Sequence, residues 1–497
     1  MSYPKDSKII IAGSGVFGLS SAMHLIDNGY TDVTIFDRLD LYALGYSFMK
    51  GADTASADIN KVFRAFYNGD ELYHKLALQA REKFVAWDEE VSKLTPEQAK
   101  EKFNMEGRFK ILDQCGVLRL DKGTELPEYM VKAVKDFENS GLRDKEYILN
   151  DPEDIERAKK DGWGEKATNT FGVKEGKNPY LKEICGVFDS TSGLLSSYNA
   201  CLYVNSYLRS KGVKFITGTA GTVLEVIQSK DGTAEGFKTA DGETHNADLV
   251  IVACGPWSAS LIPELAGLSE AQNGNVVLVK IPDDKKDLIA KYSPENFPMI
   301  SWRLDKAVER ERFAGMLSFP LSTNDGMVKF IIRQKKYNNP TKLDTGVTTS
   351  VPVTTNSTPA ESRVSKAVIE QVKQFIKVFV PDLAEFGIHS TRLLWYTDTI
   401  NNDFIIDHVP GKKNLVVVTG GSGHGFKFLP VLGKFVVELL QGKQNEKRFN
   451  WRDPKSAKDI NTIGTVLTGE NAYYKQELAT EEDLKFTKED LEAPVEI

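Results

Sequence analysis

The sequence is poor in the residues that build metal sites and crosslinks. It has four cysteines and six histidines among 497 residues, and no two cysteines stand in a C-x-x-C pair. Neither residue type shows the spacing of a zinc site. We therefore expect no bound metal, and we expect free thiols in a reducing compartment.

Long apolar runs and basic clusters are also missing. No stretch approaches the roughly 18 apolar residues of a membrane span, and the net charge of −7 argues against nucleic acid as a partner. The four residues Met1 to Pro4 leave no room for a secretion signal, and the chain does not end in Ser-Lys-Leu. We expect a cytoplasmic protein, long enough for two domains with sizeable cores.

Glycines, in contrast, stand at informative places, first in the opening forty residues. A strand over 8–12 runs into Gly13, Gly15 and Gly18, and a helix and a second strand that ends at Asp37 follow. Gly13 permits a tight turn, Gly15 allows close approach of a pyrophosphate, and Gly18 lets the helix pack on the sheet. The pattern predicts a dinucleotide site. An ordinary strand-to-helix turn is the alternative, and FAD and NAD stay equally open at this point.

Two later strands also run into glycines. Residues 247–254 read as a buried parallel strand that reaches Gly255, after an antiparallel meander over 222–247. Residues 415–419 read as another buried strand, followed by a turn with glycines at 420, 421, 423 and 425. Several glycine turns at the carboxyl ends of parallel strands favour a large flavin cofactor over a simple nicotinamide domain.

Other segments are predicted from periodicity. We expect helices over 70–93, 198–212, 363–380 and 431–440, short helices and turns over 94–185, and a loop over 338–362. Four strands between 276 and 335 would form a second sheet that carries the substrate. In the last of them, Lys329 and Arg333 share a face; a solvated edge strand is the alternative interpretation.

Five motifs together resemble one enzyme family. They are Gly13-x-Gly-x-x-Gly18, Asp58-x-Asn-Lys61, Val252-Ala-Cys-Gly-Pro-Trp257, Trp395-x-x-Asp-Thr399 and Gly423-His-Gly-Phe-Lys-Phe-Leu-Pro430. They resemble the fungal fructosyl amino acid oxidases (amadoriases), relatives of monomeric sarcosine oxidase and of saccharopine and pipecolate oxidases. The resemblance implies an α/β fold, with a glutathione-reductase-type FAD-binding Rossmann domain and a mixed antiparallel-sheet substrate domain. It also implies oxidation of a secondary amine next to a carboxylate, with hydride transfer to flavin N5, hydrolysis of the imine, and reduction of O2 to H2O2.

The resemblance also implies roles for single residues. Lys427 corresponds to a lysine that holds the substrate carboxylate, and Arg64 to the arginine paired with it in sarcosine oxidases. Lys329 falls on a buried lysine that promotes the oxygen reaction, where a cation stabilises developing negative charge. Lys61 matches a lysine near the flavin, so Lys329 and Lys61 are the catalytic candidates. Tyr396 occupies a substrate-pocket position.

The cofactor contacts expected from the resemblance and the glycine turns come from several segments. They are Gly13, Ser14, Gly15, Val16, Phe17, Gly18, Asp37, Arg38, Ser56, Asn60, Lys61, Val223, Gly255, Trp257, Gly423, Gly425, Phe426 and Lys427.

Three positions depart from the family pattern. Leu394 stands where most relatives carry the cysteine that binds FAD covalently, so we expect noncovalent FAD. Arg64 replaces the small residue of amadoriases, and Arg333 replaces an acid that contacts substrate. A guanidinium at 333 suits a second carboxylate, as in saccharopine, which weakens the case for a fructosyl substrate.

The resulting domain assignment is discontinuous. We expect residues 1–64, 186–262 and 403–442 to bind FAD, residues 65–185 and 263–402 to form the substrate domain, and residues 443–497 to be a polar extension. The partners would be O2 and a small substrate derived from an amino acid, and we expect a monomer. A sarcosine- or pipecolate-type oxidase, a nicotinamide-dependent dehydrogenase and a flavin-binding protein without oxidase activity are the alternatives.

Overall fold

A computed structural model describes residues 3–303, 315–333, 336–354, 363–443, 446–456, 459–461 and 463–495. Its first layer is a six-stranded sheet. In spatial order the strands are β21 (Ile405–His408), β22 (Leu415–Thr419), β13 (Leu249–Val252), β1 (Lys8–Ala12), β2 (Asp32–Asp37) and β9 (Lys214–Thr217). All neighbours are parallel except β21 and β22. The strands predicted at 8–12, 247–254 and 415–419 are thus confirmed, and the structure shows that they are neighbours in one sheet.

Both faces of this sheet are covered, which explains the uninterrupted apolar run of β1. Ile9 and Ile11 face a core formed with α1 (Val16–Asp27), α7 (Ser197–Ser210) and α11 (Gly433–Leu440). Ile10 faces the opposite core, which includes Phe237 of the meander. The predicted meander consists of β10 (Val223–Gln228), β11 (Ala234–Thr239) and β12 (Thr244–Asn246). A strand that is buried on both faces needs apolar side chains at odd and even positions alike, because successive side chains point to opposite faces.

The second large sheet has eight strands. In order they are β20 (Ser390–Thr399), β14 (Ser269–Lys280), β17 (Met327–Arg333), β16 (Gly315–Ser318), β15 (Met299–Arg303), β5 (Val117–Lys122), β7 (Ile184–Asp189) and β6 (Glu146–Ile148). Only the pair β15 and β5 is parallel. Helix α10 (Lys366–Phe379) packs on one face, where Phe375 contacts Phe330. The mixed sheet expected for the substrate side is confirmed.

The expectation of only short helices and turns over 94–185 was wrong. That segment contributes β5 and β6 to the eight-stranded sheet. It also contributes β4 (Leu112–Asp113) to a three-stranded sheet, whose other strands, β3 (Lys61–Phe63) and β8 (Gly193–Leu195), come from outside the segment. Residues 186–189, expected in the FAD-binding part, lie in β7 and pair with β5. Both errors have one cause, since these strands find their partners far along the chain. The expected loop over 338–362 carries a hairpin, β18 (Pro340–Lys342) and β19 (Thr348–Ser350), and residues 355–362 lie outside the described part.

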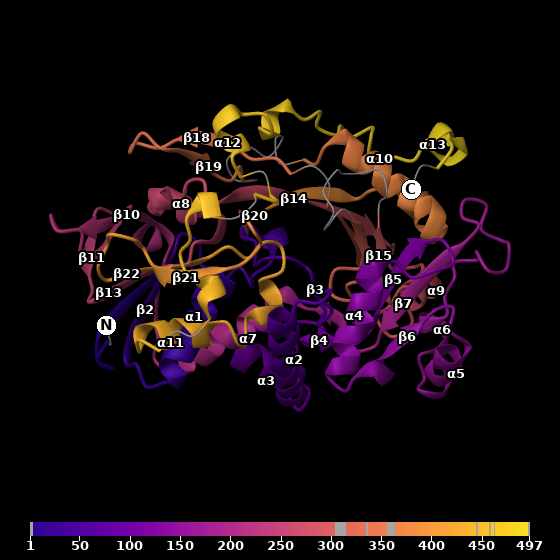
Figure 1. Cartoon of the computed structure of the whole chain (residues 1–497), viewed down its shortest axis with the longest axis horizontal. Helices are drawn as coiled ribbons and strands as arrows, with labels where there is room; N and C mark the ends of the chain where they lie inside the picture. The colour runs from indigo at the N-terminus through magenta and orange to yellow at the C-terminus, as the bar shows by residue number, and fades with distance from the viewer. Residues whose placement is uncertain are drawn as a thin grey trace.

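The remaining helices lie around the two sheets (Figure 1). They are α2 (Glu71–Val91), α3 (Pro96–Phe103), α4 (Glu128–Asn139), α5 (Pro152–Lys160), α6 (Gly164–Ala167), α8 (Ser258–Leu261), α9 (Lys286–Lys291), α12 (Thr465–Thr468) and α13 (Lys488–Glu492). The Asp70 carboxylate caps α2 at Tyr73 N. Among the described residues, no helix is both long and apolar enough to span a membrane.

The C-terminal extension packs back on the eight-stranded half. It runs along the top of Figure 1, past β18, β19 and α10. The Lys373 ammonium group of α10 donates to the Asp490 carboxylate at 2.8 Å, and Lys377 donates to the backbone oxygens of Asp490 and Ala493. The extension is therefore part of the folded body.

Candidate functional site

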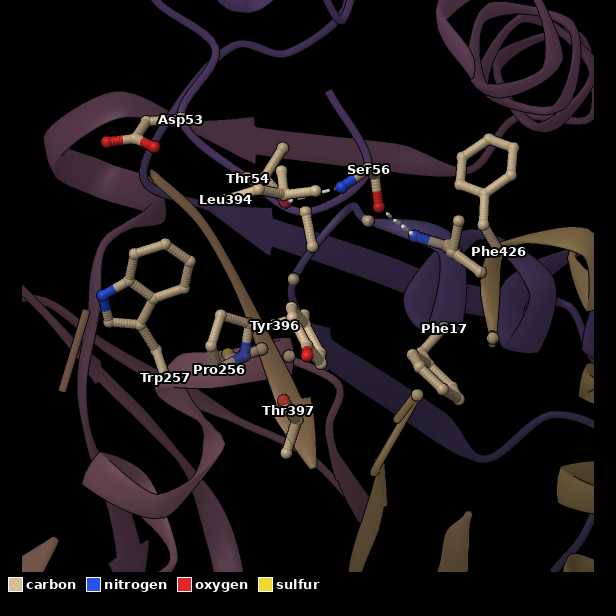
Figure 2. A pocket seen from close by; sticks show the side chains of 18 of the residues that line it. Phe17, Asp53, Thr54, Ser56, Pro256, Trp257, Leu394, Tyr396, Thr397 and Phe426 are labelled. Carbon is tan, nitrogen blue, oxygen red and sulfur yellow. Dashed lines mark hydrogen bonds between the residues drawn. The ribbon is translucent and has the colours of Figure 1, made fainter. Parts of the chain in front are cut away.

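A cavity of about 540 Å³ lies between the two large sheets. Its walls come from the β1–α1 turn, the end of β2, the segment after β13, the middle of β14 and β20, and residues 421–427. In Figure 2, Trp257 lies on one side of this space, Phe17 and Phe426 lie on the other, and Tyr396 and Thr397 lie between them. The glycine turns that the sequence singled out thus meet at one place.

The opening glycine turn leaves no room for side chains. A Cβ atom on Gly13, whose φ is +102°, would lie 2.5 Å from the Ala253 oxygen, and one on Gly18 would lie 1.9 Å from the Gly13 oxygen. At Gly15 it would meet the Ser56 hydroxyl at 3.0 Å. Helix α1 begins just after Gly15, and Ser56 Oγ accepts from Val16 N at 2.9 Å. The helix N-terminus therefore faces the cavity, an arrangement that favours a bound phosphate.

The acid that ends β2 lies at the same end of the cavity. Asp37 Oδ2 accepts hydrogen bonds from the backbone and hydroxyl of Ser14, both at 2.8 Å. Burial raises the pKa of Asp37 above its ordinary value. The Arg38 guanidinium lies 4.3 Å from the centre of the Trp257 ring. An acid together with a flat apolar wall suits the ribose and base of an adenosine.

A buried charged cluster lies at the other end. Asp58 and Lys329 have side chains that are 0 % exposed, and the Asp58 carboxylate lies 2.7 Å from Lys61 Nζ and 3.0 Å from Lys329 Nζ. Lys329 also donates to the Asn60 backbone oxygen. Burial lowers the pKa of Lys61, and the two lysines together hold the pKa of Asp58 well below its usual range. Lys61 lines the cavity, while Lys329 lies behind it.

The second glycine-rich turn brings a cation to the same region. Lys427 is 1 % exposed and donates to the Tyr67 hydroxyl oxygen at 2.9 Å and to the His424 backbone oxygen at 3.1 Å. The Arg64 guanidinium lies 4.6 Å from the centre of the Tyr67 ring. Arg64 and Lys427 both line the cavity. Two cations at one end of a largely apolar cavity provide a site for an anionic group.

Most of the expected site residues line this one cavity. Those in its wall are Gly13, Gly15, Val16, Phe17, Asp37, Arg38, Ser56, Lys61, Arg64, Val223, Gly255, Trp257, Tyr396, Gly423, Gly425, Phe426 and Lys427. Ser14, Gly18, Asn60 and Lys329 lie behind the wall. The side chain of Arg333 lies outside the described part, so its expected contact with substrate is not tested.

Sequence reasoning missed several residues of the site. Asp58 and His424 lie inside motifs that were recognised, but neither was given a role. Tyr67 follows Arg64 by three residues and was not considered. Arg392 donates to the backbone oxygens of Thr54 and Ala57, more than 300 positions earlier in the chain. No local pattern could have found that contact, because both acceptors are backbone oxygens.

The residues present fit an FAD molecule. At Gly13 and Gly18 a Cβ atom would meet backbone oxygens, so only glycine allows this tight turn, and Gly13 and Gly15 line the cavity with backbone alone. Thr397 Oγ1 is buried, and the Asn60 amide has both polar atoms buried; these atoms have no hydrogen-bond partner among the described residues. Buried polar groups need partners, and a dinucleotide carries many. No cluster of three or more possible metal ligands occurs in the described part of the chain.

Comparison with known proteins agrees with this geometry. The family model described as FAD dependent oxidoreductase matches residues 8–439. The L-saccharopine oxidase of Schizosaccharomyces pombe is 26 % identical over 91 % of this chain and 94 % of its own length. The amino acid oxidase imqH of Aspergillus flavus is 24 % identical over 89 % of this chain and 95 % of its own length. The structure of fructosyl peptide oxidase from E. terrenum superposes with a TM-score of 0.73 at 21 % identity. The superposition covers 97 % of this chain and 100 % of that oxidase.

Proposed function

The chain belongs to the family of FAD-dependent oxidoreductases, and on that premise we propose that it oxidises the secondary amine of an N-substituted amino acid, with O2 as electron acceptor. The amine loses a hydride from carbon and a proton from nitrogen, water hydrolyses the imine, and O2 takes up two electrons and two protons to give H2O2. The observation that carries the proposal is the pair Arg64 and Lys427 in the cavity wall, since such a pair binds a carboxylate.

In this proposal the six-stranded sheet and its helices form the FAD-binding unit. The α1 N-terminus with Gly13 and Gly15 would hold the pyrophosphate of FAD, Asp37 and Trp257 would hold the adenosine, and residues 423–427 would hold the flavin end. When bound, FAD would supply the two-electron acceptor that links oxidation of the amine to reduction of O2. The eight-stranded sheet covers the other side of the cavity.

The substrate is held by charge. Lys427 is buried, so its ammonium group interacts strongly with an anion. Arg64 adds a planar donor that can bind a carboxylate through two hydrogen bonds. We place the carboxylate next to these two side chains and the amine nearer Tyr396. A small residue at position 64, which the resemblance implies for amadoriases, would leave one cation, so Arg64 favours substrates of the saccharopine or sarcosine type over fructosyl amino acids.

The purified yellow protein should produce H2O2 with one member of a defined substrate panel. The panel is saccharopine, sarcosine, pipecolate, fructosyl-valine and fructosyl-lysine, assayed by peroxide formation and O2 consumption. We expect saccharopine to be turned over fastest, because it carries the most carboxylates. Yellow protein that consumes no O2 with any secondary amine next to a carboxylate would contradict the proposal and support a flavin-binding role without oxidase activity.

We further propose that the FAD is noncovalent. Leu394, an apolar side chain with no nucleophile, lines the cavity at the position expected for the linking cysteine (Figure 2). Of the four cysteines only Cys254 lines the cavity, at the Gly13 end, and burial raises the pKa of its thiol to about 12, so it is not a thiolate at neutral pH. Precipitation with acid should release the yellow colour into the supernatant. Colour that stays with the pellet after unfolding in denaturant would disprove noncovalent binding.

A further inference from the structure

Tyr67 connects the residues that line the anionic end of the cavity. Its hydroxyl oxygen lies 2.9 Å from Lys427 Nζ and 3.1 Å from His424 Nδ1. Its ring lies under the Arg64 guanidinium, with 4.6 Å between the guanidinium carbon and the ring centre. Arg64, His424 and Lys427 line the cavity, whereas Tyr67 lies behind them. One side chain thus contacts both proposed carboxylate-binding cations without lining the cavity itself.

The direction of each hydrogen bond follows from His424. Its Nε2 lies 3.1 Å from the Asn402 backbone oxygen. A carbonyl oxygen only accepts, so Nε2 carries a proton. In the neutral imidazole with its proton on Nε2, the other ring nitrogen, Nδ1, accepts a hydrogen bond.

The Tyr67 hydroxyl group must then donate to His424 Nδ1, which leaves its oxygen as an acceptor for the Lys427 ammonium group. The chain runs in one direction, from Lys427 through Tyr67 and His424 to the Asn402 oxygen. Hydrogen bonds in such a chain polarise one another. Tyr67 accepts from one of the three N–H groups of the Lys427 ammonium and thereby fixes the orientation of that ammonium group.

The aromatic rings around Tyr67 fix its position. Its ring stacks on Tyr73 with 5.3 Å between centroids, and Tyr73 in turn donates from its hydroxyl to Asp403 at 3.1 Å. Arg448 pairs with both Asp403 and Asp70, the N-cap residue of α2. The stacked Tyr73 ring therefore holds the Tyr67 ring against α2, and this stacking does not need the Tyr73 hydroxyl.

We propose that Tyr67 is a positioning residue for carboxylate recognition, which orients Lys427 through its hydroxyl and supports Arg64 through its ring. The inference rests on the proposed function, because it assumes that the anion between Arg64 and Lys427 is a carboxylate. It adds that the affinity of the site for carboxylates depends on a phenol group that touches neither substrate nor cofactor.

The test uses the FAD-loaded enzyme and two probes, benzoate and the uncharged benzamide, with binding followed by the change in flavin absorbance. Tyr67→Phe keeps the ring and removes the hydroxyl group. A hydrogen bond to a charged group is worth about tenfold in affinity, so we expect about tenfold weaker benzoate binding and unchanged benzamide binding. With an amine substrate, KM should rise by about the same factor while kcat changes less than twofold.

Tyr73→Phe is the matched control, because it removes a hydroxyl from the stacked ring next door, which bonds Asp403 instead of Lys427. It should leave benzoate binding unchanged. If Tyr67→Phe does not bind FAD, His424→Gln provides the second variant, and it should also weaken benzoate binding selectively.

The possible outcomes separate the two proposals. Benzoate binding that is equal in the wild type and in Tyr67→Phe, or equally weakened in Tyr73→Phe, overturns the role of Tyr67 and leaves the oxidase proposal intact. A wild type that does not prefer benzoate over benzamide overturns the carboxylate site, and both proposals fall with it. The inference is supported if Tyr67→Phe binds benzoate more weakly than the wild type and benzamide equally well, while Tyr73→Phe binds both as the wild type does.

Discussion

Replacing Lys329 by methionine is expected to slow the reaction of the substrate-reduced enzyme with O2 by about 100-fold. Methionine has a similar length but no charge, so it removes the cation while filling the space. Lys329 is fully buried, and its ammonium group lies 3.0 Å from the Asp58 carboxylate that also binds Lys61. In such a dry site a positive charge stabilises developing negative charge strongly. Stopped-flow mixing of anaerobically reduced enzyme with O2 measures the effect.

The same experiment gives a pH dependence. Burial lowers the pKa of Lys329 to about 7; Asp58 opposes this shift, and Lys61 adds to it. The ammonium form predominates below this pKa, so the rate constant for O2 should fall as pH rises through about 7. Methionine does not titrate, and the dependence should disappear in Lys329→Met.

Lys280→Met provides a control for loss of a lysine from the same sheet. Lys280 lies on β14 and donates to the Asp325 backbone oxygen, and it does not line the cavity. Its replacement should not change the O2 reaction. If Lys329→Met reacted with O2 at the wild-type rate, or if it slowed reduction by the substrate to the same extent, the assignment of Lys329 to the oxygen step would be wrong.

The parts of the fold that the sequence predicted correctly are those with strong local signals. β1, β13 and β22 are apolar runs that end at glycines, and such runs are typical of parallel strands buried on both faces. The glycines at 13, 15 and 18 were recognised by their spacing between a strand and a helix, and the chain does turn from β1 into α1 there. These features depend on neighbouring residues only.

The parts that the sequence missed depend on partners far along the chain. β5 pairs with β7 and β15, which lie more than 60 and 170 residues later, and its own residues carry no unambiguous period. Asp58 was recognised as part of a motif, but its contact with Lys329 joins positions 271 residues apart. Even the position of Lys329 behind the cavity wall, and not in it, follows only from how β17 packs against residues 58–61.

Asp58→Asn is expected to destabilise the protein by about 3–5 kcal/mol, the usual effect of removing one partner from a buried ion pair. Asparagine has nearly the same shape, so no cavity forms. The loss is electrostatic, because Lys61 and Lys329 keep their burial but lose the carboxylate that both contact. Thermal unfolding of the FAD-loaded protein, followed by flavin fluorescence, measures the change relative to wild type.

Loss of the Asp58 carboxylate should also change the charge of Lys329. Without Asp58, the attraction that opposes the lowered pKa of Lys329 is gone, so Lys329 should be neutral at pH 7 and the O2 reaction should slow as in Lys329→Met. The double variant Asp58→Asn/Lys329→Met removes the buried lysine that has to lose its proton in Asp58→Asn, and with it the free-energy cost of that loss. It should therefore unfold at a higher temperature than Asp58→Asn alone, a non-additivity typical of residues in contact. Two results would show that Asp58 is not the counter-ion that keeps the buried lysines charged. One is a double variant whose loss of stability equals the sum of the losses in the two single variants. The other is an Asp58→Asn variant that unfolds at the wild-type temperature and reacts with O2 at the wild-type rate.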